Sequence, residues 1–351
     1  MSDISKIDRN FAIQTCLAVD NMKLYDIQEE PFSVYGVFYE NGKYRRIPEK
    51  VAKTVSDGVY ELHTHTAGGR VKFITDSSYI AIKAVMPEVG KMPHFALTGS
   101  AGFDLYVGKK EDYFASFVPP FDITEGFESI IRFESTAERE ITINFPLYSS
   151  VASLYIGLDK NAVLKKTAGY KHSKPIVCYG SSITQGGCAT RPGNAYESMV
   201  SRKLQIDHIN LGVSGSAQGE DEMAQYISTL DMSVFVFDYD HNAPTLQHLQ
   251  ETHQKMFLTI RKNNPDLPII LMSRPKYRLD EEGKLRLEVI KKTYNDAIAA
   301  GDKNVFLIDG PTLMRYAKNH GTVDGDHPND LGFYSMAKAL LRQLKKVHYQ
   351  F

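Results

Sequence analysis

The chain has 351 residues, of which 42% are hydrophobic and 24% are charged, a composition typical of a globular protein. This length exceeds one typical domain and is sufficient to bury a core in each of two domains. The 41 basic and 42 acidic side chains give a net charge of −1, which argues against nucleic-acid partners and against a polybasic membrane-binding surface.

The N-terminal residues 1–20 are polar and mixed in charge, and no short apolar stretch there leads to a small-residue cleavage site. No run of about 18 apolar residues occurs, so we expect neither a signal peptide nor a transmembrane helix. The three cysteines, Cys16, Cys178 and Cys188, are an odd number without metal-ligand spacing. These features favour a reduced, cytoplasmic setting, and Cys178 lies in an apolar run typical of a core.

Short runs rich in Val, Ile, Phe, Tyr and Thr dominate residues 33–158, separated by Gly, Pro, Asp and Asn. They occupy residues 32–39, 58–67, 71–86, 103–108, 113–121, 129–135, 139–148 and 151–158. The pattern predicts an antiparallel β-sandwich or jelly roll. In the second run, His63 and His65 would alternate on one strand face. Two such histidines can bind a metal, but without a third ligand we expect a solvated face.

A polar, basic segment at residues 160–175 follows, and we place the domain boundary inside it, giving domains 1–170 and 171–351. Beyond the boundary, apolar runs alternate with helix-like runs. The apolar runs are 176–180, 208–213, 233–239, 268–273 and 304–309, and the helix-like runs are 194–204, 220–230, 244–263, 285–300 and 330–347. Continuous apolar strands alternating with helices predict a parallel sheet covered on both faces, a flavodoxin-like three-layer α/β/α domain.

Polar residues follow four of these apolar runs, at the sheet edge where open α/β sheets bind ligands. They are GSSIT at 180–184, SGS at 214–216, DHN at 240–242 and DGDHP at 324–328. Acyl transfer needs such a set: a serine nucleophile, a histidine base, a carboxylate that orients the imidazole, and N–H donors for the oxyanion. The backbone N–H groups of Ser182 and Gly215 and the side-chain amide of Asn242 are candidate donors.

The four blocks together resemble those of SGNH hydrolases, also called GDSL lipases and esterases. GSSIT resembles the first block, Gly-Asp-Ser-Ile or Leu, and the last glycine of NLGVSG resembles the second. Asn242 resembles the asparagine of the third block, and DGDHP resembles the last block, Asp-X-X-His-Pro. The resemblance covers about residues 174–348. A shorter run, GFDLY at 102–106, resembles a motif of the N-terminal sandwich domain that accompanies some bacterial members.

The resemblance implies catalytic roles for three residues: Ser182 as nucleophile, His327 as base and Asp324 as its orienting acid. It also implies that Ser182, Gly215 and Asn242 form the oxyanion hole. Each residue has a plainer alternative. Ser182 would be a helix N-cap, and Ser181 would then be the rival nucleophile. His327 would be a surface histidine and Asp324 a loop residue, with Asp326 as the rival acid. Gly215 would only permit a tight turn, and Asn242 would cap a helix.

The sequence departs from the family pattern beside the nucleophile and beside the oxyanion hole. Ser181 stands where the family has Asp, and Asp240 stands where it has Gly. A carboxylate at position 240 would oppose the developing oxyanion charge unless it points away or is paired.

Three further residues near the predicted edge are candidates for substrate binding. Gln185 and Arg191 follow the nucleophile and are candidates for rim contacts. Arg274 is a candidate for an anionic substrate group, or else for a surface salt bridge. The segment MPHFALTGSAGFDLY at 92–106 is apolar and glycine-rich. We expect core packing for most of it, although it is also placed to lean over the active site.

The function implied by this resemblance is serine-dependent hydrolysis of carboxylic esters through an acyl-enzyme. Short acyl groups, such as acetyl on a sugar or a related small alcohol, are the first expectation, because similar enzymes with an appended sandwich often handle carbohydrate. We expect no metal, no organic cofactor, and neither nucleic acid nor membrane as partner; a homo-oligomer stays open. Two alternatives are an acyltransferase with an acceptor other than water, and a non-catalytic carbohydrate-binding protein on the same scaffold.

Overall fold

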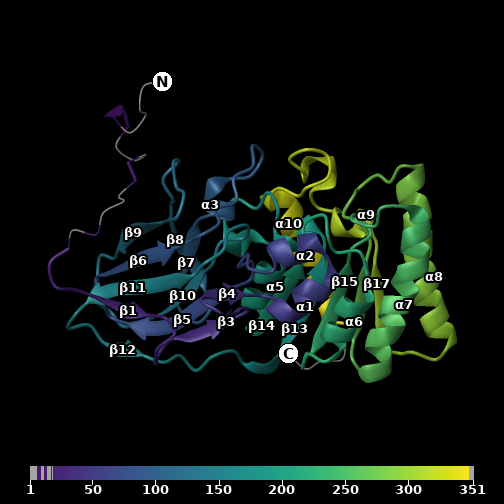
Figure 1. Cartoon of the computed structure of the whole chain (residues 1–351), viewed down its shortest axis with the longest axis horizontal. Coiled ribbons are helices and arrows are strands. Elements are labelled where there is room, and N and C mark those ends of the chain that lie inside the picture. The colour runs from purple at the N-terminus through teal and green to yellow at the C-terminus, as the bar shows by residue number, and fades with distance from the viewer. Residues whose placement is uncertain (1–5, 9–11, 14–16, 18, 348–351) are drawn as a thin grey trace.

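The computed structural model describes residues 6–8, 12, 13, 17 and 19–347. Antiparallel strands from the N-terminal half lie beside an α/β unit from the C-terminal half (Figure 1). One antiparallel sheet has the order β1-β11-β6-β9, and the other has the order β12-β5-β10-β7-β8, with β2 paired to β5.

The two sheets are built from ten strands of the N-terminal half. The first sheet comprises β1 (Met22–Asp26), β6 (Tyr79–Val85), β9 (Gly126–Arg132) and β11 (Ser153–Asp159). The second comprises β2 (Ser33–Tyr35), β5 (Arg70–Thr75), β7 (Phe103–Val107), β8 (Asp112–Phe117), β10 (Arg139–Asn144) and β12 (Leu164–Lys165). A separate hairpin joins β3 (Phe38–Glu40) to β4 (Lys43–Arg45).

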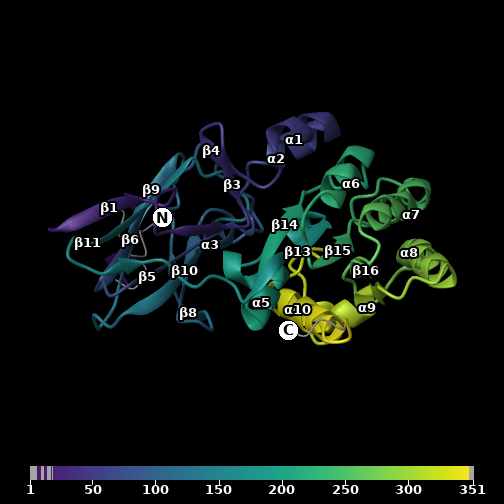
Figure 2. The same ribbon diagram turned by 90° about the horizontal axis from the view of Figure 1, so that it is seen from below.

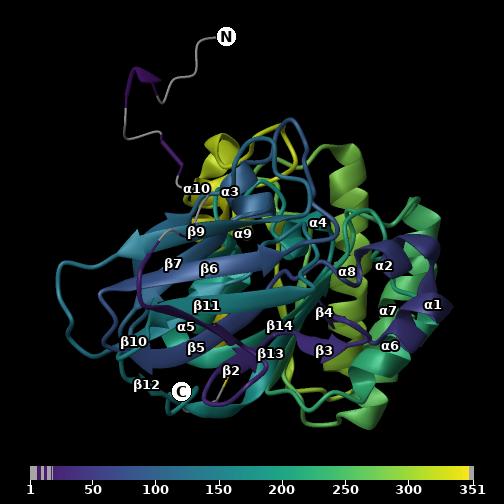
Figure 3. The same ribbon diagram turned by 60° about the vertical axis from the view of Figure 1, so that its left-hand side comes forward.

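The two N-terminal sheets are held together by one apolar core. Ile82 of β6 is paired with Ile156 of β11 in the first sheet, and Ile143 of β10 is paired with Leu105 of β7 in the second. All four side chains are fully buried in the same cluster. The antiparallel sheets agree with the sequence expectation for this half, and Figure 3 turns them toward the viewer. The jelly-roll connectivity stays a prediction.

The C-terminal half contains a five-stranded parallel sheet in the order β14-β13-β15-β16-β17. Its strands are β13 (His172–Gly180), β14 (Ile206–Gly212), β15 (Val234–Asp238), β16 (Ile269–Met272) and β17 (Val305–Ile308). Its helices are α4 (Ser182–Gln185), α5 (Tyr196–Leu204), α6 (Asp221–Ser228), α7 (Leu246–Asn263), α8 (Glu281–Ala299), α9 (Gly310–Leu313) and α10 (Asp330–Leu344). Counted along the chain, the order 2-1-3-4-5 is that of flavodoxin-like folds.

Strand β13 shows why both faces of this sheet are covered. Its residues alternate between the faces, as a strand's period of two requires. Ile176 and Cys178 lie in a core cluster with side chains of α5 and α10. Val177 and Tyr179 lie in a second cluster with side chains of α6, α7 and α8. Figure 2 shows the two groups of helices on either side of the sheet. Cys178 is fully buried, as its apolar surroundings in the sequence predict.

One sequence prediction is wrong: residues 58–67 do not form a strand. The chain forms α1 (Glu49–Val55) and α2 (Asp57–Leu62), and the Ser56 side chain caps α2 by accepting a hydrogen bond from the Val59 N–H. Ala52 and Val59 are buried in the C-terminal core. Packing against that core outweighs the local β preference.

Consequently His63 and His65 do not share a solvated strand face. The His63 side chain is 3% exposed and stacks on Tyr60, with ring centroids 5.2 Å apart. His65 Nδ1 lies 3.2 Å from the Gln185 amide nitrogen. In the part of the chain that the structure describes, no helix has both the length and the apolar sequence needed to cross a membrane.

Candidate active site

The turn from β13 into α4 places two serines side by side in different environments. The Ser181 side chain is fully buried, and its hydroxyl accepts a hydrogen bond from the Ile183 N–H at 3.2 Å as the helix N-cap. The Ser182 hydroxyl lies 2.9 Å from His327 Nε2. The capping role therefore belongs to Ser181, and the hydroxyl beside a base belongs to Ser182.

His327 is held from its other side by Asp324, in the loop between α9 and α10. His327 Nδ1–H donates to Asp324 Oδ2 at 2.7 Å, which leaves Nε2 to accept the Ser182 proton. The backbone N–H groups of His327 and Asp326 donate to Asp324 Oδ1 at 2.8 and 3.0 Å. The rival acid, Asp326, instead pairs with Lys276 at 3.3 Å.

These hydrogen bonds also fix the charge of the Asp324 carboxylate. Burial by itself would raise the pKa of Asp324. Hydrogen bonds from the His327 ring and from the two backbone N–H groups outweigh that effect and hold the pKa of Asp324 well below its usual range. Asp324 is therefore ionised at neutral pH.

Three N–H donors face no protein acceptor within the described residues: the backbone groups of Ser182 and Gly215, and one amide hydrogen of Asn242. Gly215 has φ +68°, and a Cβ there would meet no atom within 4 Å. Asn242 Nδ2 donates to the Val213 carbonyl at 3.1 Å. Because a side-chain amide has two hydrogens, this contact orients Asn242 beside the Gly215 loop and leaves one donor for an oxyanion.

The carboxylate of Asp240 is paired with a cation, which is one of the two conditions that its sequence position raised. Its side chain is 1% exposed, and Oδ1 lies 3.5 Å from Arg274 Nε. Burial raises the pKa of Asp240, and the charges of Arg274 and Arg286 oppose that rise. Arg286 also donates to the carbonyls of Asp240 and Ala243, at 2.7 and 3.0 Å, and so holds the segment on both sides of Asn242.

The three residues suggested for substrate binding are engaged by the protein itself. The Gln185 side chain is fully buried, and its Oε1 accepts from the Ser214 N–H at 3.0 Å, which ties the nucleophile helix to the Gly215 loop. Arg274 pairs with Asp240, but the salt bridge is buried and not at the surface as the alternative expected. Arg191 Nη1 lies 3.3 Å from the Asp104 carboxylate. These contacts indicate positioning roles and do not favour substrate contacts.

The GFDLY motif supplies the partner of Arg191. Asp104 is fully buried, and it accepts hydrogen bonds at 2.8 Å from the Asn144 amide and from the Gly193 N–H. Burial raises the pKa of Asp104, while the Asn144 hydrogen bond and the Arg191 charge oppose the rise. The motif therefore docks the N-terminal sheets onto the turn at residues 190–194, which follows α4 in the chain.

Comparison with protein families gives this arrangement its context. Residues 173–345 match the model of the GDSL-like lipase/acylhydrolase family, and residues 22–164 match the model of the N-terminus of SGNH-hydrolase-type esterases. Residues 173–345 therefore form a domain of the GDSL-like lipase/acylhydrolase family. The chain is an ester hydrolase. No curated protein matches the sequence of this acylhydrolase.

Solved structures similar to this acylhydrolase share its whole architecture. A candidate GDSL-like lipase from Bacteroides ovatus is 29% identical with a TM-score of 0.83, covering 93% of this chain and 98% of that one. The salicylyl-acyltransferase SsfX3 from a tetracycline biosynthetic pathway is 18% identical, with a TM-score of 0.77 and coverages of 95% and 99%. An acetyl xylan esterase from Butyrivibrio proteoclasticus is 14% identical, with a TM-score of 0.59 and coverages of 93% and 98%. The last two show the shared fold.

The N-terminal half of the acylhydrolase also contributes side chains that no catalytic motif marks. The Tyr148 hydroxyl donates to the Ser182 carbonyl at 3.1 Å. The Phe95 ring packs on Tyr148 and on His327, with centroids 4.7 and 6.3 Å apart, and the His94 ring lies 5.7 Å from the His327 ring. In the sequence, only the apolar, glycine-rich segment 92–106 pointed to contacts between the N-terminal half and the site.

Arg46 reaches further into the C-terminal half of the acylhydrolase. Its side chain is 1% exposed and donates to the carbonyls of Gly212 and Asn210, at 2.6 and 3.1 Å. Burial lowers the pKa of Arg46 to about 10. Burial raises the pKa of Glu197 to about 8, although a hydrogen bond from the Asn210 amide and the charge of Arg46 lower it in part.

The raised pKa of Glu197 predicts a pH-dependent stability. Between about pH 4.5 and 8 the folded acylhydrolase keeps a proton on Glu197 that the unfolded chain loses, so stability falls as pH rises through this window. Because Gln cannot ionise, Glu197→Gln should raise Tm relative to wild type by at least about 2 °C more at pH 8 than at pH 5. Thermal melts at both values test this, with the exposed Glu288→Gln as control. Equal shifts at both pH values would contradict it.

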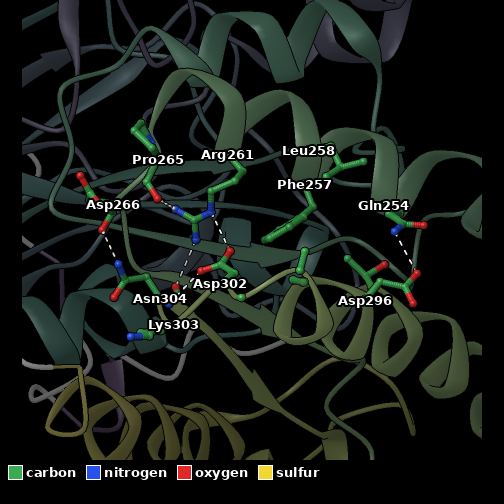
Figure 4. A pocket seen from close by; sticks show the side chains of 14 residues that line it. Gln254, Phe257, Leu258, Arg261, Pro265, Asp266, Asp296, Asp302, Lys303 and Asn304 are labelled. Carbon is green, nitrogen blue, oxygen red and sulfur yellow. Dashed lines mark hydrogen bonds and ion pairs between the residues drawn. The ribbon is translucent and has the colours of Figure 1, made fainter.

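A groove of about 530 Å³ lies between α7 and α8, away from the catalytic set (Figure 4). Phe257 and Arg261 of α7 line it, and Arg261 pairs with Asp302 at 2.8 Å. Pro265 and Asp266, together with residues 300–304 of its lining, lead into β16 and β17. The groove is therefore at the amino edge of the sheet, whereas Ser182 follows the carboxyl end of β13.

Proposed function

We propose that this acylhydrolase works through an acyl-enzyme on Ser182, with His327 as general base and Asp324 as orienting acid. The observation that carries the proposal is the unbroken contact chain from the Ser182 hydroxyl through the imidazole to the carboxylate, with links of 2.9 and 2.7 Å. The neighbouring N–H donors fit an oxyanion at the carbonyl that Ser182 would attack.

The reaction proceeds in two balanced halves. Ser182 Oγ forms a bond to the ester carbonyl carbon while His327 Nε2 takes the hydroxyl proton. The tetrahedral oxyanion accepts hydrogen bonds from Ser182, Gly215 and Asn242. When the C–O bond of the ester breaks, the imidazolium gives its proton to the departing alcohol. Water then repeats the attack on the acyl-enzyme, releasing the acid and restoring the serine.

Removing the Asn242 side-chain donor should slow turnover. Asn242→Ala should lower kcat by about 10²–10³-fold with a smaller change in KM, because the donor acts mainly on the oxyanion of the transition state. Steady-state kinetics with an activated acetate ester measure this. Asn304→Ala, at the amino edge of the sheet, is the matched control. An unchanged kcat would remove Asn242 from the oxyanion hole.

We propose short acyl esters of carbohydrates or related small alcohols as substrates. The Phe95 ring packs on His327, and the Tyr148 ring packs on Phe95, so that aromatic side chains lie close to the reacting groups. An acetyl xylan esterase among the similar structures acts on a substrate of this kind. The test compares p-nitrophenyl esters of increasing chain length with acetylated sugars. The proposal predicts the highest kcat/KM for acetyl esters, and preference for long-chain esters would refute it.

Transfer of the acyl group to an alcohol other than water is a second candidate. One observation favours it: the salicylyl-acyltransferase SsfX3 aligns over 95% of this chain. The two reactions share the acyl-enzyme and differ in what attacks it. Product analysis with competing sugar and alcohol acceptors separates them. Free acid as the sole product supports hydrolysis, whereas a transferred ester at low acceptor concentration supports the transferase.

A further inference from the structure

Three potential metal ligands from different parts of the chain meet beside the catalytic base. They are His94, on the loop between β6 and α3 (Leu97–Ser100), Cys188, in the loop after α4, and His327. Within the described residues, one ligand atom of each lies within 4.8 Å of the other two. His94 Nε2 is also 3.9 Å from Asp324 Oδ2.

The donor types and their surroundings suit a particular class of cation. Two imidazole nitrogens and one sulfur are the ligands that zinc prefers. His327 is already prepared as a ligand, because its Nδ1–H donates to Asp324 and its Nε2 keeps the lone pair. A carboxylate behind a ligating histidine is the usual outer partner in zinc sites. One thiolate together with Asp324 would balance the two charges of Zn²⁺.

We propose that His94, Cys188 and the Nε2 atom of His327 bind Zn²⁺ reversibly, and that the bound ion switches the esterase off. The consequence for activity rests on the proposed function, since it requires His327 to be the base. On binding, the Cys188 S–H bond breaks, a sulfur–zinc bond forms, and the proton passes to solvent. The lone pair that would take the Ser182 proton is then held by the metal.

The site must tighten slightly to hold zinc. Bond lengths of about 2.0–2.3 Å place the donors of a tetrahedral zinc roughly 3.3–3.7 Å apart. The present spread of up to 4.8 Å is wider by about 1 Å. The His94 side chain is 38% exposed on its loop and supplies the movement, while Cys188 is 4% exposed and stays fixed. Water or substrate would take the fourth position.

The first experiment measures inhibition. Zn²⁺ should inhibit the wild-type enzyme, and EDTA should restore its rate. Loss of an outer partner of a zinc site typically costs 10–100-fold in affinity. Loss of a direct ligand should cost no less, so His94→Gln and Cys188→Ser should each raise the half-inhibiting concentration at least about tenfold. Each variant is compared with its own metal-free rate. His320→Gln, an exposed histidine outside the cluster, should leave the value unchanged.

The second experiment measures binding without activity. Co²⁺ is added to the Ser182→Ala protein, in which the base is intact but the nucleophile is absent. A thiolate-to-cobalt charge-transfer band should appear in the near ultraviolet, disappear with added Zn²⁺, and be absent when Cys188→Ser is combined with Ser182→Ala. Thermal melts confirm that each variant is folded, and Zn²⁺ should raise the Tm of the Ser182→Ala protein.

The outcomes separate the two proposals. A cobalt band in the Ser182→Ala protein, together with a wild-type protein that has no esterase activity, would support the metal site and refute the proposed function. An active esterase that shows neither zinc inhibition nor the band would overturn the metal site alone. Equal inhibition of wild type and both ligand variants would mean that zinc acts elsewhere, and would also overturn it.

Discussion

Ser182→Ala is expected to lower kcat by about 10⁴–10⁶-fold and to abolish covalent labelling by a fluorophosphonate probe. The alanine has no oxygen to form the acyl-enzyme, while the oxyanion donors and His327 stay in place. Only slow attack by water remains. Hydrolysis of an activated acetate ester and mass spectrometry of the labelled protein measure the two effects.

The neighbouring serine provides the matched control for that variant. Ser181→Ala removes the cap that accepts the Ile183 N–H, so it should cost about 1 kcal/mol of stability and leave labelling intact. A thermal melt and the same probe distinguish the two variants. If Ser181→Ala lost the label and Ser182→Ala kept it, the assignment of the nucleophile would be reversed.

Asp324→Asn should lower kcat by about 10⁴-fold at neutral pH with little change in structure. An asparagine at this position can present its amide N–H to the imidazole, which stabilises the wrong tautomer and no longer supports the imidazolium. Because hydrogen bonds from His327 and Asp326 hold the pKa of Asp324 well below its usual range, protonation of this carboxylate should not limit activity under mildly acidic conditions.

Asp326→Asn is the counterpart for this test. The Asp326 side chain is 52% exposed and pairs with Lys276 at the surface. Such a pair contributes little, so kcat should change less than about threefold. Stopped assays from pH 5 to 9 on both variants give the comparison. A large loss in Asp326→Asn with a mild effect in Asp324→Asn would exchange the roles of the two acids.

The parallel sheet could be predicted from the sequence because its strands are buried on both faces. Runs such as residues 176–180 therefore contain almost only apolar residues and differ from the amphipathic helices between them. The structure of residues 58–67 was harder to predict, because their β-branched and aromatic residues are compatible with both a strand and a helix. Only Ser56, a good N-cap, indicated the helix that packs on the distant C-terminal core.

The blocks around Ser182, Gly215, Asn242 and His327 could be located from the sequence because each follows a strand of the same sheet. Spacing along the chain does not reveal which way a neighbouring side chain points. Gln185 ends α4 and Arg191 lies in the loop that follows, yet their partners, His65 and Asp104, are 120 and 87 residues away. The tyrosine that holds the Ser182 carbonyl is likewise outside every block. Such long-range contacts exist only once both halves have folded.

The buried guanidinium of Arg46 has a consequence for protein engineering. It belongs to the first half of the chain but satisfies the Asn210 and Gly212 carbonyls next to the oxyanion loop. A fragment cut at the domain border would leave those oxygens unsatisfied in a dry interior, and a chimera with a foreign first half would need an equivalent cation. In chimeras between relatives, the two halves should therefore be transferred together and not as independent modules.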